Sequence, residues 1–460
     1  MASCTVSILF LLIVAMSATE PPGCKIRITN RGLEMLKYET QKFVVEELSN
    51  ITMPEMKGNE GRFEYTINEV KINELNLTYA DLAFQPGLGL LFEVQNSSIA
   101  LSFQRRILYW FFYDTGAINA SAEGVNIHTV LHMTKDELGR LKISNITCDA
   151  SIGKMKMKFT GTLGRVYDFL ATFLTTGMRF LLNQQICPAM NHAGLVLINS
   201  LLETIPVRTE VDKYVGIDYS LLSDPVVTSR SLDMDFRGMF FELENENNTL
   251  VNYAVNPIVR EYDRMVYLGL SEYFFDSGLY SYYKAGIFQM NIANERVSMR
   301  PESAVMCCNP ILSPYPISLR LELNSAPKTT IKTSGATVAV TAIATVMVLP
   351  PGTAPVQLSS MTMGGEGGAQ QLNIRKAFLM FGILSVYQNP LTMLQISIVP
   401  IINNWTKRGV SIPLADGLDF IEEVVEYHNG YLIIGANLHF SKGLREMIER
   451  KIQADPENAI

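Results

Sequence analysis

One uncharged run constrains the fold more than any other stretch of the sequence. Residues 336–349 carry no charge, and Pro350 and Pro351 end the run. A helix needs about 20 apolar residues to cross a bilayer, so this run is too short to do so. Threonine or alanine alternates with valine along much of it, which is typical of a β-strand. At about 3.3 Å per residue this strand would reach roughly 46 Å, and the sequence therefore predicts an unusually elongated sheet.

The first half of the chain contains further long alternations. Between residues 63 and 77 the apolar residues change parity twice, before Val70 and before Leu75, and two β-bulges that bend a long strand would produce this pattern. Residues 154–159 alternate lysine with an apolar residue, which indicates a strand with one solvated face. The Gly-Gly-Glu-Gly-Gly run at 364–368 instead indicates a loop.

Three segments place apolar residues at the spacing of an amphipathic helix. The first runs from Leu33 to Leu48 and the second from Val166 to Leu181. The third lies at 391–405, where Pro400 should kink it. Long strands combined with a few helices predict an α+β fold. A chain of 460 residues is long enough for two domains, each with its own core.

The first residues of the chain are typical of a secretory signal peptide, predicted at 1–18. An uncharged apolar run is followed there by Ser17 and Ala18, small residues that suit cleavage. Six cysteines are present and Cys4 lies inside this signal, so an odd number remains in an oxidising compartment. At least one thiol is then free or pairs with another chain. Spacing alone leaves open the connectivity of Cys24, Cys148, Cys187, Cys307 and Cys308.

Seven N-x-Ser/Thr sequons support export, because such sequons accept glycans in secreted proteins. They lie in both halves of the chain and are predicted at solvent-facing strand edges or loops. The acceptor residues are Asn50, Asn76, Asn96, Asn119, Asn145, Asn247 and Asn404. We therefore expect a secreted, extracellular glycoprotein.

The charge balance excludes one class of partner. The formal net charge is -7, whereas binding to nucleic acid depends on Lys and Arg that neutralise phosphates. Charged residues make up only 18% of the chain and apolar residues 48%. This composition is poorer in charge than the soluble average. The chain therefore carries extra apolar surface that something must cover.

Several long strings of this sequence are similar to those of one known family. They are residues 22–29, 108–125, 178–188, 216–221, 232–238, 263–271, 357–363 and 438–446. Through them the chain resembles the lipid-binding plasma proteins that include bactericidal permeability-increasing protein, lipopolysaccharide-binding protein, and the cholesteryl ester and phospholipid transfer proteins. The similarity is strongest to the members that transfer phospholipid, and it extends over nearly the whole length after the signal.

The resemblance implies a boomerang of two elongated antiparallel β-barrels, each with a long amphipathic helix, joined by a central β-sheet. The implied parts are an N-terminal lipid-binding barrel at 19–209, a central sheet and linker at 210–260, a C-terminal lipid-binding barrel at 261–440 and a charged tail at 441–460. The family's disulfide falls on Cys148 and Cys187, which leaves Cys24 free. Residues 296–311 and 364–388 look shorter than the family pattern, so the second barrel is expected to be abbreviated.

The resemblance also implies a non-catalytic carrier that holds phospholipid acyl chains in apolar pockets. It would move phospholipid between lipoproteins, including HDL, and membranes, with phospholipid as its ligand and no cofactor or metal. Apolipoproteins are a further partner that this activity would allow. Faces of the first two helices would line the first pocket, and ordinary core packing is the alternative interpretation. The predicted lipid-binding residues are Leu33, Leu36, Phe43 and Val44 in the first helix, Phe169, Phe173, Met178 and Leu181 in the second, and Phe440 at the second pocket.

Five consecutive aromatic residues occupy 109–113. As a strand they would be buried on both faces. As a loop at a barrel tip they would contact a lipid surface, where Trp and Tyr are favoured, and both alternatives remain open. The two arginines before them could meet phosphate headgroups, although such cations are often simply solvated. The predicted membrane or lipoprotein contacts are Tyr109, Trp110, Phe111, Phe112, Arg105 and Arg106.

Other functions fit the sequence less well. A lipopolysaccharide-binding innate-immune protein of the same fold is the alternative, but it would need a dense cationic tip, and this chain is acidic. A neutral-lipid carrier ranks third, because its family pattern ends in an apolar helix and the tail from 441 is charged. A secreted lipase would need a catalytic motif, and neither G-x-S-x-G nor H-E-x-x-H occurs. We therefore expect no enzymatic activity.

Overall fold

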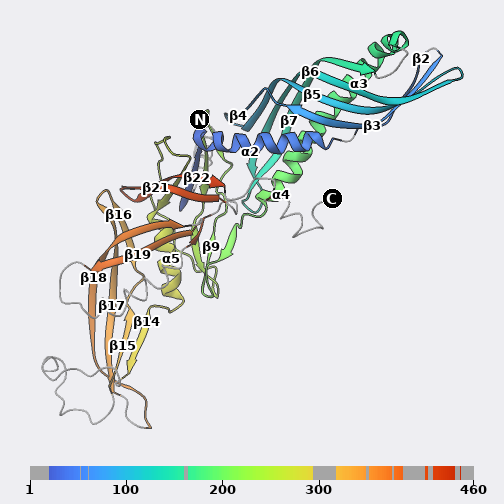
Figure 1. Ribbon diagram of the computed structural model, residues 1–460. Helices are drawn as coiled ribbons and strands as arrows, with labels where there is room; N and C mark the ends of the chain where they lie inside the picture. The colour runs from blue at the N-terminus through green and yellow to red at the C-terminus, as the bar shows by residue number, and fades with distance from the viewer. Residues whose placement is uncertain are drawn as a thin grey trace, which may run out of the picture.

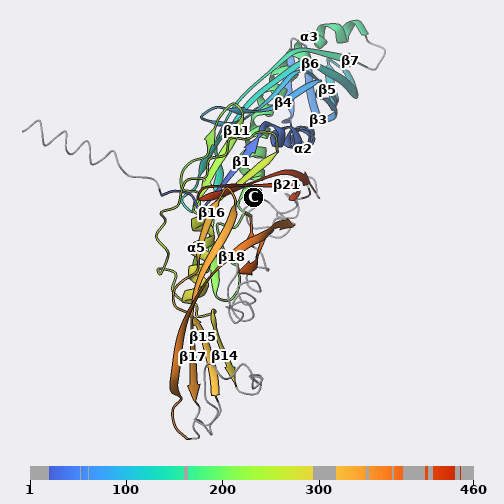
Figure 2. The same cartoon turned by 90° about the vertical axis from the view of Figure 1, so that its left-hand side faces the viewer.

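The computed structural model describes residues 20–51, 53–60, 62–159, 164–293, 317–348, 352–375, 378–386, 410–412, 418–440 and 446. The molecule is elongated and bent, with the N-terminal half at one end, the C-terminal half at the other, and a shared sheet between them (Figure 1 and Figure 2). Its sheets are antiparallel and its helices are few. The predicted α+β class and elongated sheets are confirmed.

The N-terminal sheet has the order β2-β3-β5-β6-β7, with β4 paired to β5. Its strands are β2 (Met56–Glu60), β3 (Phe63–Asn76), β4 (Tyr79–Gln85), β5 (Gly89–Tyr109), β6 (Phe112–Lys135) and β7 (Leu141–Phe159). The pairing of β3 with β5 shifts register between Asn68 and Lys71 and again between Ile72 and Glu74. The two irregularities predicted from the change of parity are therefore confirmed. Such bulges bend a long strand.

Two helices run along this sheet (Figure 1). The helical segments of this half are α2 (Asn30–Ser49), α3 (Gly164–His192), the π-helix η1 (Ala193–Ile198) and α4 (Asn199–Leu202). The last three follow one another without a break, so the second helix continues well past its predicted end at Leu181, through Pro188. Cys148 of β7 is bonded to Cys187 of α3, as the resemblance implied.

A six-stranded central sheet joins the halves in the order β10-β11-β1-β13-β22-β21. Its strands are β1 (Cys24–Thr29), β10 (Val226–Val227), β11 (Ser231–Phe236), β13 (Val266–Ser271), β21 (Leu418–His428) and β22 (Tyr431–Phe440). β1 pairs with β11 on one side and with β13 on the other. Across it, Arg27 Nε donates to Asp233 Oδ1 over 2.6 Å, and Nη1 donates to the carbonyl oxygen of Val259 over 2.8 Å. The segment 210–260, predicted as central sheet and linker, supplies β10 and β11 to this sheet. The domain limits expected from the sequence stay predictions.

The C-terminal half contains a second long sheet in the order β14-β15-β17-β18-β19-β20, with β16 paired to β17. Its strands are β14 (Gln289–Ala293), β15 (Ile317–Leu323), β16 (Lys328–Lys332), β17 (Gly335–Val348), β18 (Val356–Arg375), β19 (Phe378–Val386) and β20 (Val410–Ser411). A small sheet of β8 (Arg208–Glu210), β9 (Val215–Asp218) and β12 (Met239–Glu242) lies between it and the central sheet (Figure 1). β17 is the strand predicted at 336–349, and its buried residues Val338, Ala342 and Val348 share one face.

The loop predicted at 364–368 is wrong. These residues lie inside β18 and pair with residues 337–341 of β17. The ladder between two strands uses backbone N–H and C=O groups, which glycine also has. Glycine weakens a strand, but a long neighbour such as β17 holds the glycine-rich segment in the sheet.

One helix was not predicted. α5 (Glu272–Lys284) is attached to β16 through carboxylates, since Glu272 Oε1 accepts from Ile331 N over 2.7 Å and Asp276 Oδ1 accepts from Thr329 N over 2.6 Å. Tyrosine and phenylalanine dominate this short segment, and they favour strands as readily as helices. The predictions that fall outside the described residues are the signal at 1–18, the helix at 391–405, Cys307 and Cys308, Asn404, and the tail at 441–460 except Glu446.

Candidate functional site

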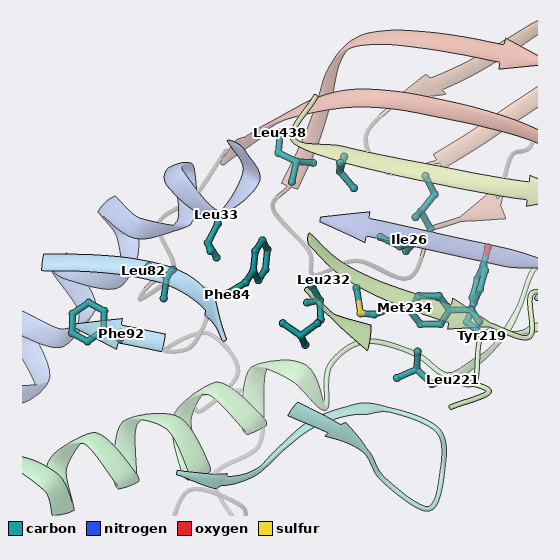
Figure 3. Packing of buried hydrophobic residues seen from close by; sticks show 14 of the residues in the cluster. Ile26, Leu33, Leu82, Phe84, Phe92, Tyr219, Leu221, Leu232, Met234 and Leu438 are labelled. Atoms are coloured by element: carbon teal, nitrogen blue, oxygen red, sulfur yellow. The ribbon is translucent and has the colours of Figure 1, made fainter. Parts of the chain in front are cut away.

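The interior of the N-terminal half is apolar and continues into the core of the central sheet. In Figure 3, Leu33 of α2 points toward Phe84 of β4, with Phe92 of β5 farther along the same sheet. Leu232 of β11 and Leu438 of β22 extend the same cluster into the central sheet. The two helices and two sheets therefore present one connected apolar interior.

The inner face of α3 carries a stripe at four-residue spacing. Its members are Leu174, Met178, Leu182, Ile186 and Met190, all buried. Met178 is 0% exposed, whereas Leu181 is only half-buried at the side of the stripe. The sequence prediction ended at Leu181 and missed the three members beyond it. The spacing of four residues would have found them.

α2 also contributes side chains to this interior. Leu33 and Val44 belong to the same buried cluster as Met178, and Leu36 packs against that cluster half-buried. Phe43 is also buried, but it lies in a separate cluster with Ala193 of η1 and Leu201 of α4. Phe43 therefore packs where the two helical segments meet rather than beside Met178.

Polar contacts hold α2 against the edge of the sheet. Lys37 Nζ lies 2.7 Å from Asp81 Oδ1, and Gln41 Nε2 donates to the carbonyl oxygen of Ala80 over 3.0 Å. Both partners are in β4, so these two contacts attach α2 to this short strand. The side chains of Phe169, Phe173 and Phe440, which were predicted to bind lipid, lie outside the described residues.

The aromatic residues lie at the far end of the N-terminal sheet, in the turn that joins β5 to β6 and in the strand ends beside it (Figure 1). Their exposed fractions are 59% for Trp110, 91% for Phe111, 73% for Phe112 and 58% for Tyr113. Trp110 has a φ of 54°, a left-handed conformation that tight hairpin turns use. We call residues 110–113 the aromatic tip. Of the two alternatives, residues 110–113 therefore form an exposed tip and not a strand buried on both faces. The side chain of Tyr109 lies outside the described residues.

The two arginines before the aromatic tip have different environments. Arg106 is exposed, with its guanidinium 5.8 Å from the centroid of the Tyr113 ring. Arg105 is only 3% exposed, and its Nη2 lies 2.9 Å from Asp114 Oδ2. Gly116 stands opposite Arg105 on β6, and a Cβ there would come within 3.1 Å of the guanidinium.

The prediction that Arg105 contacts headgroups is therefore wrong. Successive side chains of a strand point to opposite faces, so the neighbour of an exposed arginine points inward. The buried guanidinium is paired with Asp114 and with the carbonyl oxygen of Ala117. A second cation does lie at the aromatic tip, because the guanidinium of Arg62 is 4.6 Å from the Trp110 ring centroid.

The remaining candidate residues are the cysteine left free by the disulfide, the glycosylation sequons and any metal ligands. Cys24 is buried with no disulfide partner in the part of the chain that is described, and burial raises the pKa of its thiol, so it stays protonated. Six sequon asparagines are exposed: Asn50, Asn76, Asn96, Asn119, Asn145 and Asn247. Within the described residues no group of His, Cys, Asp and Glu could hold a metal ion. Across those same residues, the helices are too short or too polar to cross a membrane.

Two family models match the chain. The N-terminal domain model of the LBP / BPI / CETP family matches residues 32–205, and its C-terminal domain model matches 209–380 and 380–440. The two segments of the second match meet at residue 380, inside the stretch 364–388 that looked shortened.

Named relatives match over nearly the full length. The chain is 48% identical to the phospholipid transfer protein of Homo sapiens, covering 97% of this chain and 96% of the human protein. It is 45% identical to the phospholipid transfer protein of Mus musculus, with the same coverage of 97% and 96%. A crystal structure of lipopolysaccharide binding protein superposes with a TM-score of 0.63 at 20% identity, covering 92% of this chain and all of that one, so the two share a fold. The chain belongs to the LBP / BPI / CETP family.

Proposed function

We propose that this protein is a secreted phospholipid transfer protein, which binds acyl chains in its apolar interior and moves phospholipid between lipoproteins and membranes. The observation that carries the proposal is the 48% identity to human phospholipid transfer protein across 97% of the chain. The fold by itself does not select phospholipid, because lipopolysaccharide binding protein has the same fold. The proposal includes no catalytic step.

The interior of the N-terminal half supports the binding step. A phospholipid leaves a membrane slowly because each exposed methylene costs about 0.8 kcal/mol, so one sixteen-carbon chain costs on the order of 12 kcal/mol. A carrier must replace the lost surroundings with its own apolar wall. The buried stripe of α3, led by Met178, and Leu33 and Val44 of α2 would supply that wall. Methionine suits this role because its unbranched side chain adapts to varied ligands.

The aromatic tip supports the docking step. Phe111 and Phe112 are largely exposed at the end of an elongated sheet, where no other described element covers them. Arg62 and Arg106 lie over the rings of Trp110 and Tyr113, so cations surround an apolar centre. This arrangement suits a lipid interface, where aromatic rings enter the headgroup region and cations meet phosphates.

Export and partner choice complete the proposal. The exposed sequon asparagines are accessible to glycosylation, and the Cys148–Cys187 disulfide suits an oxidising compartment. HDL and other lipoproteins would then be donors and acceptors, with apolipoproteins as additional contacts on their surface.

The test is a transfer assay on the secreted protein. Lipids extracted from the purified protein are identified by mass spectrometry. The rate at which the protein transfers labelled phosphatidylcholine from vesicles to lipoprotein is then measured. We expect bound phospholipid and saturable transfer. A parallel assay measures binding to lipopolysaccharide. Lipid-free protein that fails to transfer phosphatidylcholine, or protein that binds only lipopolysaccharide, would overturn the proposal.

A further inference from the structure

Three arginines surround the aromatic tip, and they do not have equivalent positions. Arg62 and Arg106 are exposed, and their guanidinium groups lie over the rings of Trp110 and Tyr113, the two outer members of the tip. Arg105 is only 3% exposed. It therefore lies beneath the aromatic tip, in the part of the sheet that carries it.

β5 directs Arg105 toward the interior. The alternate residues Phe103, Arg105 and Ile107 of this strand are all buried, so they share the inner face. Ile67 of β3 and Gly116 of β6 stand opposite Arg105 on the two neighbouring strands. A guanidinium in such surroundings has lost its water, and this loss must be compensated by partners within the protein.

β6 supplies the partners of this guanidinium. Arg105 Nη2 and Nε donate to Asp114 Oδ2 over 2.9 Å and 3.1 Å, and Nη1 donates to the carbonyl oxygen of Ala117 over 3.1 Å. Gly116 lies between these two partners, and a Cβ there would come within 3.1 Å of Nη2. Glycine within a strand often marks a place where another group approaches closely. The planar guanidinium therefore fixes β5 to β6 directly beside the turn that carries the tip.

Stability alone is a poor explanation for this arrangement. The desolvation of a buried ion pair offsets much of its Coulombic attraction, and apolar residues in its place are often as stable. A forked arginine contact does give a defined geometry. The element next to it is the turn from which Phe111 and Phe112 project, 91% and 73% exposed. A turn that is already ordered loses less conformational entropy when it binds.

We propose that Arg105 and Asp114 are positioning residues for lipid docking, because their buried ion pair holds the aromatic tip in one orientation in which Phe111 and Phe112 enter a lipid surface together. Neither Arg105 nor Asp114 touches the lipid, and both act through the two phenylalanines. The inference rests on the proposed function, since it concerns the docking step of that activity.

The test measures flotation of the purified full chain with neutral phosphatidylcholine vesicles. Asp114→Asn keeps the shape of the side chain but removes the charge that compensates the guanidinium. Arg105→Lys keeps the positive charge but loses the planar fork, and it serves if Asp114→Asn fails to fold. Glu123→Gln is the matched control, because it breaks another ion pair of the same sheet, in which Lys156 Nζ lies 2.7 Å from Glu123 Oε1.

We expect vesicle binding to weaken about tenfold in Asp114→Asn and about threefold in Arg105→Lys, while Glu123→Gln stays within about twofold of the wild type. Hydrogen exchange of the backbone amides at 107–115, measured without vesicles, should be faster in the first two variants and unchanged in the control. This second measurement reports the order of the tip itself.

A double-mutant cycle separates positioning from a general structural role. Asp114→Asn is combined with Phe111→Ser, and vesicle binding is compared with that of Phe111→Ser alone. If Asp114 acts through the phenylalanines, its replacement should cost less in this background, about threefold or less instead of tenfold. A general loss of structure would cost the same in both backgrounds.

Several results would overturn the inference. They are wild-type vesicle binding by Asp114→Asn or by Arg105→Lys, an equal loss in Glu123→Gln, unchanged hydrogen exchange at 107–115, and a tenfold loss that persists beside Phe111→Ser. Transfer of labelled phosphatidylcholine by the wild type separates the two proposals. Its absence would contradict the proposed function, whereas the comparison of variants in vesicle binding decides the role of the ion pair.

Discussion

Replacement of Phe111 by serine tests the aromatic tip with little risk to folding. Phe111 is 91% exposed, so its substitution removes almost no packing. A phenylalanine side chain offers about 200 Å² of surface, of which the exposed share is about 180 Å². At about 25 cal/mol per Å², complete insertion into lipid would contribute about 4.5 kcal/mol. Half insertion would contribute about 2 kcal/mol, so Phe111→Ser should weaken binding to a lipid surface roughly 30-fold.

The measurement is flotation of the purified protein with neutral phosphatidylcholine vesicles. Leu138→Ser is the matched control, because Leu138 is 63% exposed in the turn between β6 and β7, at the opposite end of the same sheet. Its binding should stay within about twofold of the wild type, since only a docked residue changes the buried area. Undiminished binding of Phe111→Ser, or equal losses in both variants, would refute insertion of the aromatic tip.

Three further predictions concern the interior and the stability of the fold. Met178→Glu should abolish phosphatidylcholine transfer while secretion persists, because keeping the carboxyl protonated at pH 7 costs about 4 kcal/mol; normal transfer would mean that Met178 does not contact the ligand. Burial raises the pKa of Asp276 from 3.8 to about 6, so its contribution to stability is fully present below pH 3.8 and is lost as the pH rises through 6. Asp276→Asn should therefore raise the unfolding free energy at pH 7.4 by up to about 3 kcal/mol, and the melting temperature with it. The unfolding free energy of this variant should also depend less on pH between pH 4 and 7. A pH dependence like that of the wild type would mean that Asp276 is not the cause. Cys148 and Cys187 are 39 residues apart, so their disulfide closes a loop and lowers the entropy of the unfolded chain. Replacing both by serine should lower the unfolding free energy, measured by urea denaturation, by about 4 kcal/mol. An unchanged urea midpoint would contradict this entropic contribution.

The strands were predictable because their pattern is local. Side chains alternate with a period of two, so the apolar residues of β3 recorded both bulges as changes of parity. A local pattern does not show which set of alternate side chains faces the interior, since that depends on the pairing of β5 with its two neighbours. For this reason the sequence did not distinguish the buried Arg105 from the exposed Arg106. The glycine run in β18 likewise owes its strand conformation to β17.

The candidate site was partly predictable for a similar reason. The stripe of α3 repeats every four residues, and Met178 was placed on it from sequence alone. Phe43 has the same helical spacing, yet it packs against η1 and α4, whose position is set by the disulfide and by Asn199.

The position of β1 between β11 and β13 has a consequence for how the chain is made. Arg27 of β1 contacts Val259, 232 residues later, and the sheet is completed only by β21 and β22 near the end of the sequence. Contacts so distant along the chain form slowly, because a long loop must close before they contribute. During synthesis β1 is therefore among the first segments to emerge and must wait for β11 and β13 from the middle of the chain, and the sheet is complete only when β21 and β22 emerge. A chain interrupted before residue 418 would leave the edge of β13 without β22, open to pairing with other chains.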